Sequence, residues 1–90
     1  MLILLSPKFA RQVKRLHPNE KKFLDKAVLK ISENPEIGDP KIGDLEGIHV
    51  FKFKIKDVQW LLAYRILSKK SLKLILIGPH ENFYRELKKN

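Results

Sequence analysis

Residues 48–78, IHVFKFKIKDVQWLLAYRILSKKSLKLILIG, contain the pattern that decides the fold. Apolar and basic side chains alternate in residues 48–55, which predicts a β-strand with one apolar and one basic face. Residues 58–67 are almost continuously apolar, as expected of a central strand covered on both faces. Residues 72–78 supply a third strand. Only short polar turns separate these strands, so we expect an antiparallel meander.

The amino-terminal half predicts one strand and two helices. Residues 2–5 are an apolar run of strand length. The serine and proline that follow suit the N-cap and first turn of a helix over residues 8–17. Pro18 and Asn19 end that helix and start a second one, in which apolar side chains recur at helical spacing. Its apolar stripe comprises Phe23, Leu24, Ala27, Val28 and Ile31.

Two further segments complete the fold prediction. Residues 35–47 contain three Gly and two Pro and predict an irregular surface crossover. Residues 79–90 begin with proline and predict a short charged helix or an irregular tail. The expected fold class is α+β in one domain over residues 1–90, in the order β-α-α-β-β-β with a short C-terminal helix. Two N-terminal helices should pack on one face of a small, mainly antiparallel sheet.

Charge suggests the kind of partner. Nineteen Lys and Arg oppose ten Asp and Glu, for a formal net charge of +9. A polyanion such as RNA is the natural partner of this surface, although Lys-rich composition also serves solubility alone.

The residues that are missing exclude several classes of protein. There is no Cys, which rules out disulfides, thiolate metal sites and a Cys nucleophile and fits a reducing cytoplasm. The apolar start MLILL is too short for a signal peptide or a membrane span, so we expect neither secretion nor a membrane. Nucleotide-binding glycine motifs and zinc-finger spacings are also missing. His17 and His49 have no partner at metal-ligand spacing, so we expect no metal and no cofactor.

Lys52 and Lys54 are the first candidate site residues. Residues two apart on a strand point the same way and lie about 6.5–7 Å apart, close to the spacing of phosphates in a nucleic acid. With Gln59 and Arg65 of the next strand, they should lie on the sheet face that the helices leave open. The alternative is an edge strand whose lysines only prevent aggregation.

His80 and Tyr84 are the second pair of candidates. His80 follows Gly78-Pro79 at the end of the last predicted strand. Histidine is the residue type best suited to exchange a proton near neutral pH. Tyr84 lies four residues further on and could stack on an RNA base. Alternatively, His80 caps a turn and Tyr84 packs on the sheet. Trp60 lies within an apolar strand, where core packing is the simpler interpretation.

These side chains suit RNA cleavage without a metal. The ribose 2′-OH can attack its own 3′-phosphate, which expels the 5′-oxygen and leaves a 2′,3′-cyclic end. Fixed cations would stabilise the charge of the transition state, and a histidine could protonate the leaving oxygen. DNA has no 2′-OH and would be inert.

Three segments together resemble the RelE/ParE superfamily of toxins. They are LEGIHVFKFKI at 45–55, WLLAYRI at 60–66 and LILIGPHENFYRELKK at 74–89, of which GPHENFYREL is the most specific. The predicted order of helices and strands agrees with a RelE-like fold. The resemblance implies the toxin of a type II toxin–antitoxin system: a metal-independent endoribonuclease that cuts mRNA in the ribosomal A site, in the cytoplasm.

The resemblance also implies roles for individual residues. Lys52 and Lys54 match the cationic pair of the basic strand, with Lys54 a possible base if its pKa is depressed. His80 occupies the position that carries Arg in RelE and His in the YafQ-like branch, and it would be the general acid. Tyr84 matches the late catalytic aromatic residue. The implied RNA- or phosphate-binding residues are Arg65, Arg85, Lys56 and Trp60.

One departure from the RelE pattern keeps other functions open. RelE carries an Arg after the aromatic residue that opens the third strand, whereas Leu61 follows Trp60 here. Arg65, further along the same strand face, could supply the lost charge. The alternatives are a ParE-like DNA gyrase inhibitor without nuclease activity and a non-catalytic RNA-binding module. The toxin interpretations imply a cognate antitoxin, with a monomeric free toxin and a heterotetramer in the complex.

Overall fold

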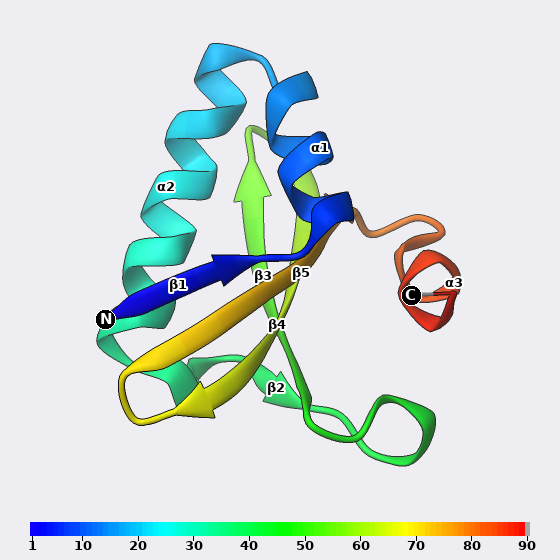
Figure 1. The fold of residues 1–90 in the computed structure, drawn as a ribbon. Helices are drawn as coiled ribbons and strands as arrows, with labels where there is room; N and C mark the ends of the chain where they lie inside the picture. Colours follow the sequence, from blue (N-terminus) through cyan, green and yellow to red (C-terminus); the bar gives the residue numbers. More distant parts are fainter. Residues whose placement is uncertain (90) are drawn as a thin grey trace.

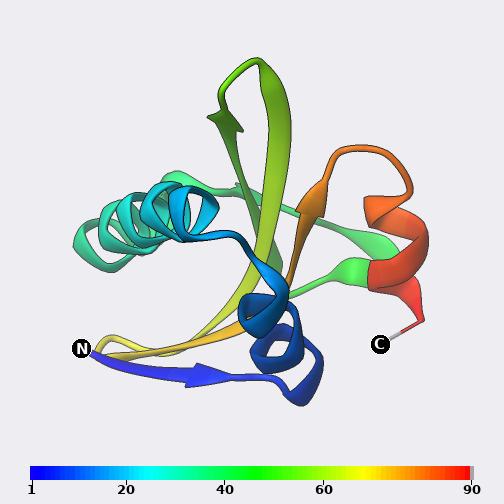
Figure 2. The ribbon, with the colours of Figure 1, turned by 90° about the horizontal axis from the view of Figure 1, so that it is seen from above.

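The computed structural model describes residues 1–89 as one sheet with helices on both faces (Figures 1 and 2). The elements are β1 (Leu2–Leu5), α1 (Pro7–Arg15), α2 (Pro18–Glu33), η1 (Pro35–Ile37), β2 (Asp39–Pro40), η2 (Gly43–Leu45), β3 (Ile48–Ile55), β4 (Val58–Ser68), β5 (Ser71–Pro79) and α3 (Phe83–Lys88). The strand order is β1-β5-β4-β3-β2. The predicted α+β fold class is therefore confirmed.

The antiparallel meander forms the centre of the sheet. β3 pairs with β4 from Ile48↔Arg65 to Ile55↔Val58, and β4 pairs with β5. The turn between β3 and β4 consists of Lys56 and Asp57, and Lys56 adopts a φ of 57°. β1 adds to the far side of β5 in parallel. The two-residue strand β2, on the outer side of β3, was not predicted because it is too short to show any periodicity.

The two N-terminal helices cover one face of the sheet, as expected (Figure 2). The Ser6 hydroxyl accepts a hydrogen bond from the Phe9 amide at 3.0 Å and so caps α1, and Pro7 occupies its first turn. Glu20 similarly accepts from the His17 amide at 2.9 Å at the start of α2. The buried core of this face comprises Phe9, Leu24, Ala27, Ile31, Leu62, Tyr64, Leu72, Leu74 and Ile77.

Tyr64 ties the crossover segment to the sheet. Its hydroxyl donates to the Pro35 carbonyl at 2.5 Å and accepts from the Gly38 amide at 3.0 Å. A Cβ at position 38 would lie 2.6 Å from this hydroxyl, so the close approach requires glycine. The Tyr64 ring also stacks on His49 at a centroid distance of 5.5 Å. The crossover is therefore irregular, as predicted, but anchored.

The second face of the sheet is only partly open. α3 packs there through Phe83 and Leu87, which are buried with Ile48, Ala63 and Leu76. Asn82 precedes α3 with a φ of 63°, which turns the chain back over the sheet. The charged tail considered from the sequence is thus a short helix with a buried side. Lys52 and Lys54 stay exposed at one end of this face, and Arg65 stays exposed at the other.

Side chains of α1 and of the residue before it satisfy part of one edge of the sheet. Beyond the end of β1, side chains complete the outer edge of β5. The Ser6 hydroxyl donates to the Ile75 carbonyl at 2.7 Å, and the Gln12 amide exchanges hydrogen bonds of 2.7 and 3.0 Å with the main chain of Ile77.

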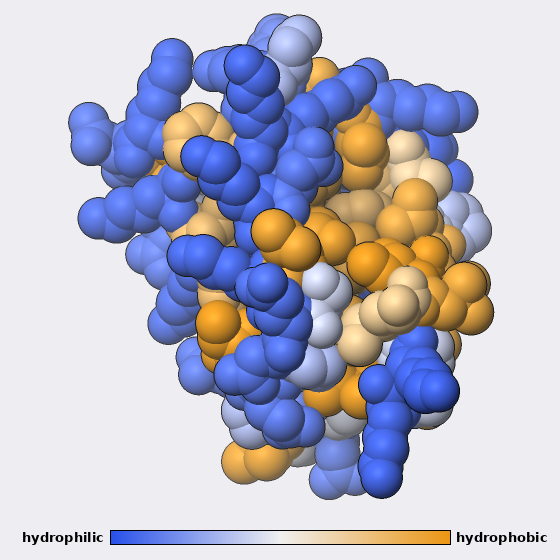
Figure 3. Space-filling model, turned by 90° about the vertical axis from the view of Figure 1, so that its left-hand side faces the viewer, coloured by the Kyte–Doolittle hydropathy of each residue, from blue (hydrophilic) through white to orange (hydrophobic). Residues whose placement is uncertain are grey.

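β1 exposes apolar side chains at the surface. Figure 3 shows apolar surface gathered toward one side of the molecule, with hydrophilic side chains over much of the rest. No helix within residues 1–89 is long and apolar enough to cross a bilayer.

We predict that Tyr64→Phe destabilises the protein by about 1–3 kcal/mol, because it leaves the Pro35 carbonyl and the Gly38 amide without their buried partner. Urea denaturation would measure this loss. Ser32→Ala is the matched control, since the Ser32 hydroxyl bonds only the exposed Leu29 carbonyl within α2. Equal stability of wild type and Tyr64→Phe would contradict the role assigned to the hydroxyl.

The same hydroxyl predicts a pH dependence. Burial raises the pKa of Tyr64 above 10.0, against the opposing effect of the Gly38 hydrogen bond. Because the pKa is higher in the folded state, the stabilisation from Tyr64 is fully present below pH 10 and is lost as the pH rises through the folded-state pKa. Stability curves of wild type and Tyr64→Phe should therefore converge at alkaline pH.

Candidate nucleic-acid interface

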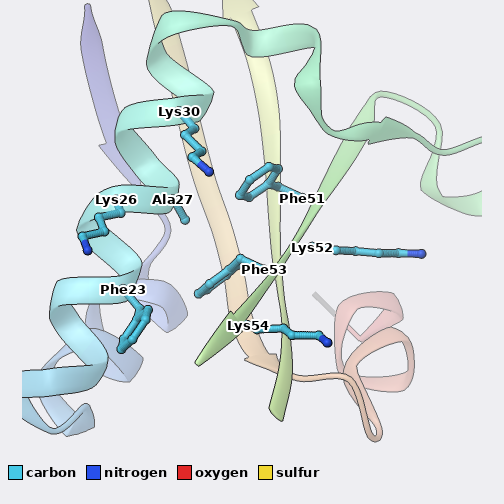
Figure 4. A pocket seen from close by; sticks show the side chains of 8 residues that line it. All are labelled: Phe23, Lys26, Ala27, Lys30, Phe51, Lys52, Phe53 and Lys54. Atoms are coloured by element: carbon cyan, nitrogen blue, oxygen red, sulfur yellow. The ribbon is translucent and has the colours of Figure 1, made fainter. Parts of the chain in front are cut away.

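Lys52 and Lys54 lie on the sheet face opposite α1 and α2. Figure 4 shows their side chains extending away from Phe51 and Phe53, which point toward α2. Both lysines are exposed, and neither forms an ion pair in the part of the chain that the structure describes. Lys52 is paired with the fully buried Leu61 and Lys54 with Gln59. The two ammonium groups thus lie over a sheet surface that is partly apolar.

His80 lies beside the lysine pair across the sheet. Its amide donates to the Gln59 carbonyl at 3.1 Å, and Gln59 is itself paired with Lys54. The row Lys54, Gln59, His80 therefore spans three neighbouring segments of chain. The main chains of Lys54 and His80 are two strand spacings apart, which is about 10 Å. At this separation the two side chains can contact the same phosphodiester.

Tyr84 stands next to His80 at the start of α3. The two rings meet edge to face at a centroid distance of 6.4 Å, and the Tyr84 ring also contacts Phe83 at 5.5 Å. The Lys41 ammonium lies 5.3 Å from the centre of the Tyr84 ring, in a cation–π contact. Tyr84 thus packs at the sheet, which was one of the two interpretations of the sequence, and it stays partly exposed beside His80.

Sequence reasoning missed Lys41. It lies in the irregular crossover, where no period assigns a direction to a side chain. The hydrogen bond from its amide to the Ile48 carbonyl, at 2.8 Å, brings it to the outer side of β3. Only the pairing of β2 with β3, which the sequence did not reveal, could have located it.

The structure separates three other candidates from this cluster. Trp60 is on the opposite face, where it pairs with Phe53 and packs against the helix-side core. Lys56, at the tip of the hairpin, borders a hollow on that side together with Trp60.

Arg65 is on the face of Lys52, as expected, but it pairs with Ile48. Ile48 and Lys54 are six positions apart on β3, which is about 20 Å. Arg65 is therefore far from Lys54, and it lies four positions, about 13 Å, from Leu61 along β4.

Two further cations lie on or near α3. Arg85 is exposed on α3, directly after Tyr84. Arg65 lines hollows near α3 with Lys73 and Lys88, and its guanidinium approaches the Glu46 carbonyl at 3.4 Å. Within residues 1–89 no group of three His, Asp or Glu side chains could hold a metal ion. The arrangement suits contact with an anionic polymer through amines, an imidazole and an aromatic ring.

An ion pair between distant parts of the chain holds α3 in place. The Lys8 ammonium of α1 lies 2.8 Å from the Glu86 carboxylate of α3. The hydrogen bond and charge of Lys8 lower the pKa of Glu86, with a smaller contribution from Lys89. This contact links α3 to α1.

The chain is similar to toxins of type II toxin–antitoxin systems. A family model described as "ParE-like toxin of type II bacterial toxin-antitoxin system" matches residues 3–88. The intact E. coli RelBE toxin–antitoxin complex contains a chain with a TM-score of 0.70 and 18% identity, over 89% of this chain and 96% of that one. A mutant of E. coli toxin RelE in complex with an antitoxin RelBc peptide gives a TM-score of 0.68 and 20% identity, over 96% of this chain and 92% of that one. No curated protein sequence matches significantly.

We predict that Lys8→Ala raises the pKa of Glu86, because it removes both the hydrogen bond and the nearest positive charge. In wild type the contact stabilises the fold above the ordinary pKa of Glu, and that contribution is lost as the pH falls through the depressed value. Carboxyl-detected NMR titration would measure the change. Lys14→Ala removes an exposed charge from the same helix and should leave Glu86 unchanged. An equal shift in both variants would refute the contact.

Proposed function

The chain belongs to the ParE-like toxin family of type II toxin–antitoxin systems, and we propose that it is a metal-independent endonuclease that cuts mRNA on translating ribosomes. The observation that carries this proposal is the row of Lys54, Gln59 and His80 across one exposed sheet face, with Lys52 beside it. A gyrase inhibitor has no need of a histidine placed opposite paired lysines, whereas phosphodiester cleavage uses both.

The proposed reaction is an internal transfer of the phosphoryl group. The ribose 2′-oxygen forms a bond to the adjacent phosphorus, and the bond from phosphorus to the 5′-oxygen breaks. The 2′-hydroxyl proton passes to the Lys54 amine in its neutral form, and protonated His80 gives a proton to the departing 5′-oxygen. The products are a 2′,3′-cyclic phosphate and a 5′-hydroxyl. Lys52 stabilises the extra negative charge of the transition state.

Neighbouring side chains would hold the RNA in place. Tyr84 is partly exposed next to His80, and we propose that a splayed base stacks on its exposed part, at about 1–3 kcal/mol per base. Lys41 lies against the Tyr84 ring and the exposed Arg85 follows Tyr84 on α3, so we propose both as contacts to flanking phosphates. Arg65 is too distant to act at the scissile bond, but it could bind RNA elsewhere along the chain.

The proposed partners are a cognate antitoxin and ribosome-bound mRNA in the cytoplasm. Both similar structures are complexes with an antitoxin. A monomeric free toxin and a heterotetramer with antitoxin remain our proposal for the assemblies.

A second candidate function is ParE-like inhibition of DNA gyrase. Two observations favour it: the description of the matching family, and the buried Leu61 where RelE carries an arginine. Under this function Lys52, Lys54 and His80 are surface residues without a catalytic role. A non-catalytic RNA-binding module would instead bind RNA and leave it intact.

We predict that His80→Ala and Lys54→Ala each lower the rate of mRNA cleavage by about 10²–10⁴-fold, the usual contribution of a general acid or base. Primer extension on a translated message, with ribosomes present and absent, would map the cuts. Lys22→Ala is the matched control, since Lys22 is exposed on α2, away from the site. Unchanged cleavage in both site variants, or gyrase inhibition without cuts, would contradict the nuclease.

We also predict that Lys52→Ala weakens RNA binding through charge alone. Removing one phosphate contact should reduce the slope of log affinity against log salt by about 0.7 for a single strand. Fluorescence anisotropy with a non-cleavable 2′-deoxy-substituted RNA at several salt concentrations would measure the slope. The Lys22→Ala slope should equal that of wild type, and an unaltered slope for Lys52→Ala would remove this lysine from the interface.

A further inference from the structure

A hollow lies at the end of the molecule where the start of α2 faces the hairpin of β3 and β4. Residues of α2, of the hairpin and of the end of β5 line it. Its volume of about 390 Å³ lies within the range of about 300–1,000 Å³ that is typical of ligand pockets. The row of Lys54, Gln59 and His80 does not contribute a side chain to this hollow.

The wall of the hollow on the sheet side is apolar and contains the only tryptophan of the chain. Trp60 is partly buried there, next to its strand partner Pro79. Val58 is 53% exposed, although its side chain is apolar. A flat aromatic ring among apolar side chains is the kind of surface on which a nucleobase stacks.

The rim of the hollow is polar. Lys56 and His17 are exposed at opposite sides of it, on the hairpin and at the start of α2. Glu20 also lines the rim, and its carboxylate accepts a hydrogen bond of 2.9 Å from the His17 amide. Donors and acceptors around an apolar slot suit the polar edge of a base. The carboxylate disfavours a phosphate group at the same place, because the two charges repel.

The hollow adjoins the candidate nucleic-acid interface at the end of β5. Pro79 lines the hollow, and His80 follows it directly in the chain. β4 pairs with β5 as far as Trp60↔Pro79, and the His80 amide then bonds the Gln59 carbonyl. The tip of the hairpin therefore extends past the end of β5 (Figure 2). An RNA strand that contacts His80 on one face can cross the sheet here and reach the hollow on the other face.

We propose that this hollow binds a base of the RNA strand near the cut, with the ring of the base against Trp60 and its polar edge toward Lys56 and His17. The proposal rests on the proposed function, which makes RNA the ligand. It adds a second base contact on the sheet face opposite Tyr84. It also gives a common role to Trp60 and Lys56, which the structure separates from the catalytic candidates.

The test uses the fluorescence of the full-length chain, because Trp60 is its only tryptophan. The probes are a short 2′-deoxy-substituted RNA, which cannot be cut, and a set of the same strand in which one nucleotide at a time lacks its base. The intact strand should quench Trp60 at the concentrations at which anisotropy reports binding. Loss of one particular base should abolish the quenching and weaken binding by about fivefold to a hundredfold, with every phosphate still present.

Three results would overturn the proposal. The first is binding of the intact strand without a change in the fluorescence of Trp60. The second is equal quenching by every strand of the set, since the phosphates and not a base would then be responsible. The third is the absence of any RNA binding at low salt.

A pair of protein variants separates the hollow from general charge. Val58→Asp places a carboxylate in the hollow at an exposed position, where the fold should tolerate it. Leu29→Asp makes the same change of charge at a residue of α2 that is 58% exposed and does not line the hollow. Val58→Asp should abolish the quenching and weaken RNA binding more than Leu29→Asp does. Equal effects of the two variants would contradict a base in the hollow.

The result is separable from nuclease activity. Quenching of Trp60 by RNA, together with a translated message that stays uncut, would support the hollow as a base site and remove the proposed nuclease. Cleavage of the message without any effect of RNA on Trp60 would remove the hollow alone.

Discussion

The register between β3 and β4 is the constraint on which the rest of the structure depends. The turn at Lys56 and Asp57 fixes the pair Ile55↔Val58, and the alternation of side chains then assigns every residue of β3 to a face. A slip of one residue would direct Lys52 and Lys54 into the helix-side core and Phe51 and Phe53 into water. Burial of the apolar face against α2 therefore also determines where the basic face points.

Much of the fold could be predicted because its signals are local. A period of two marks β3, a continuous apolar run marks β4, and proline and serine mark the helix starts. β2 could not be predicted, since a two-residue strand has no period and exists only because β3 offers an edge. For α3, the sequence left both a helix and an irregular tail open, because six residues carry too few apolar positions to show a helical stripe.

The candidate site was predictable in part, because the alternation of side chains along a strand is also a local signal. Alternation was sufficient to place Lys52, Lys54 and Arg65 on one face, but a shared face does not fix a distance along the strand. The long β4 carries Arg65 away from Gln59, to the end of the strand where it pairs with Ile48. Lys41 was missed because its position depends on contacts between segments far apart in sequence.

The excess of positive charge has a consequence for the stability of the fold. A small domain buries a modest fraction of its surface, and unneutralised lysines on one face repel each other in the folded state. A bound polyanion would relieve that repulsion and stabilise the fold by mass action.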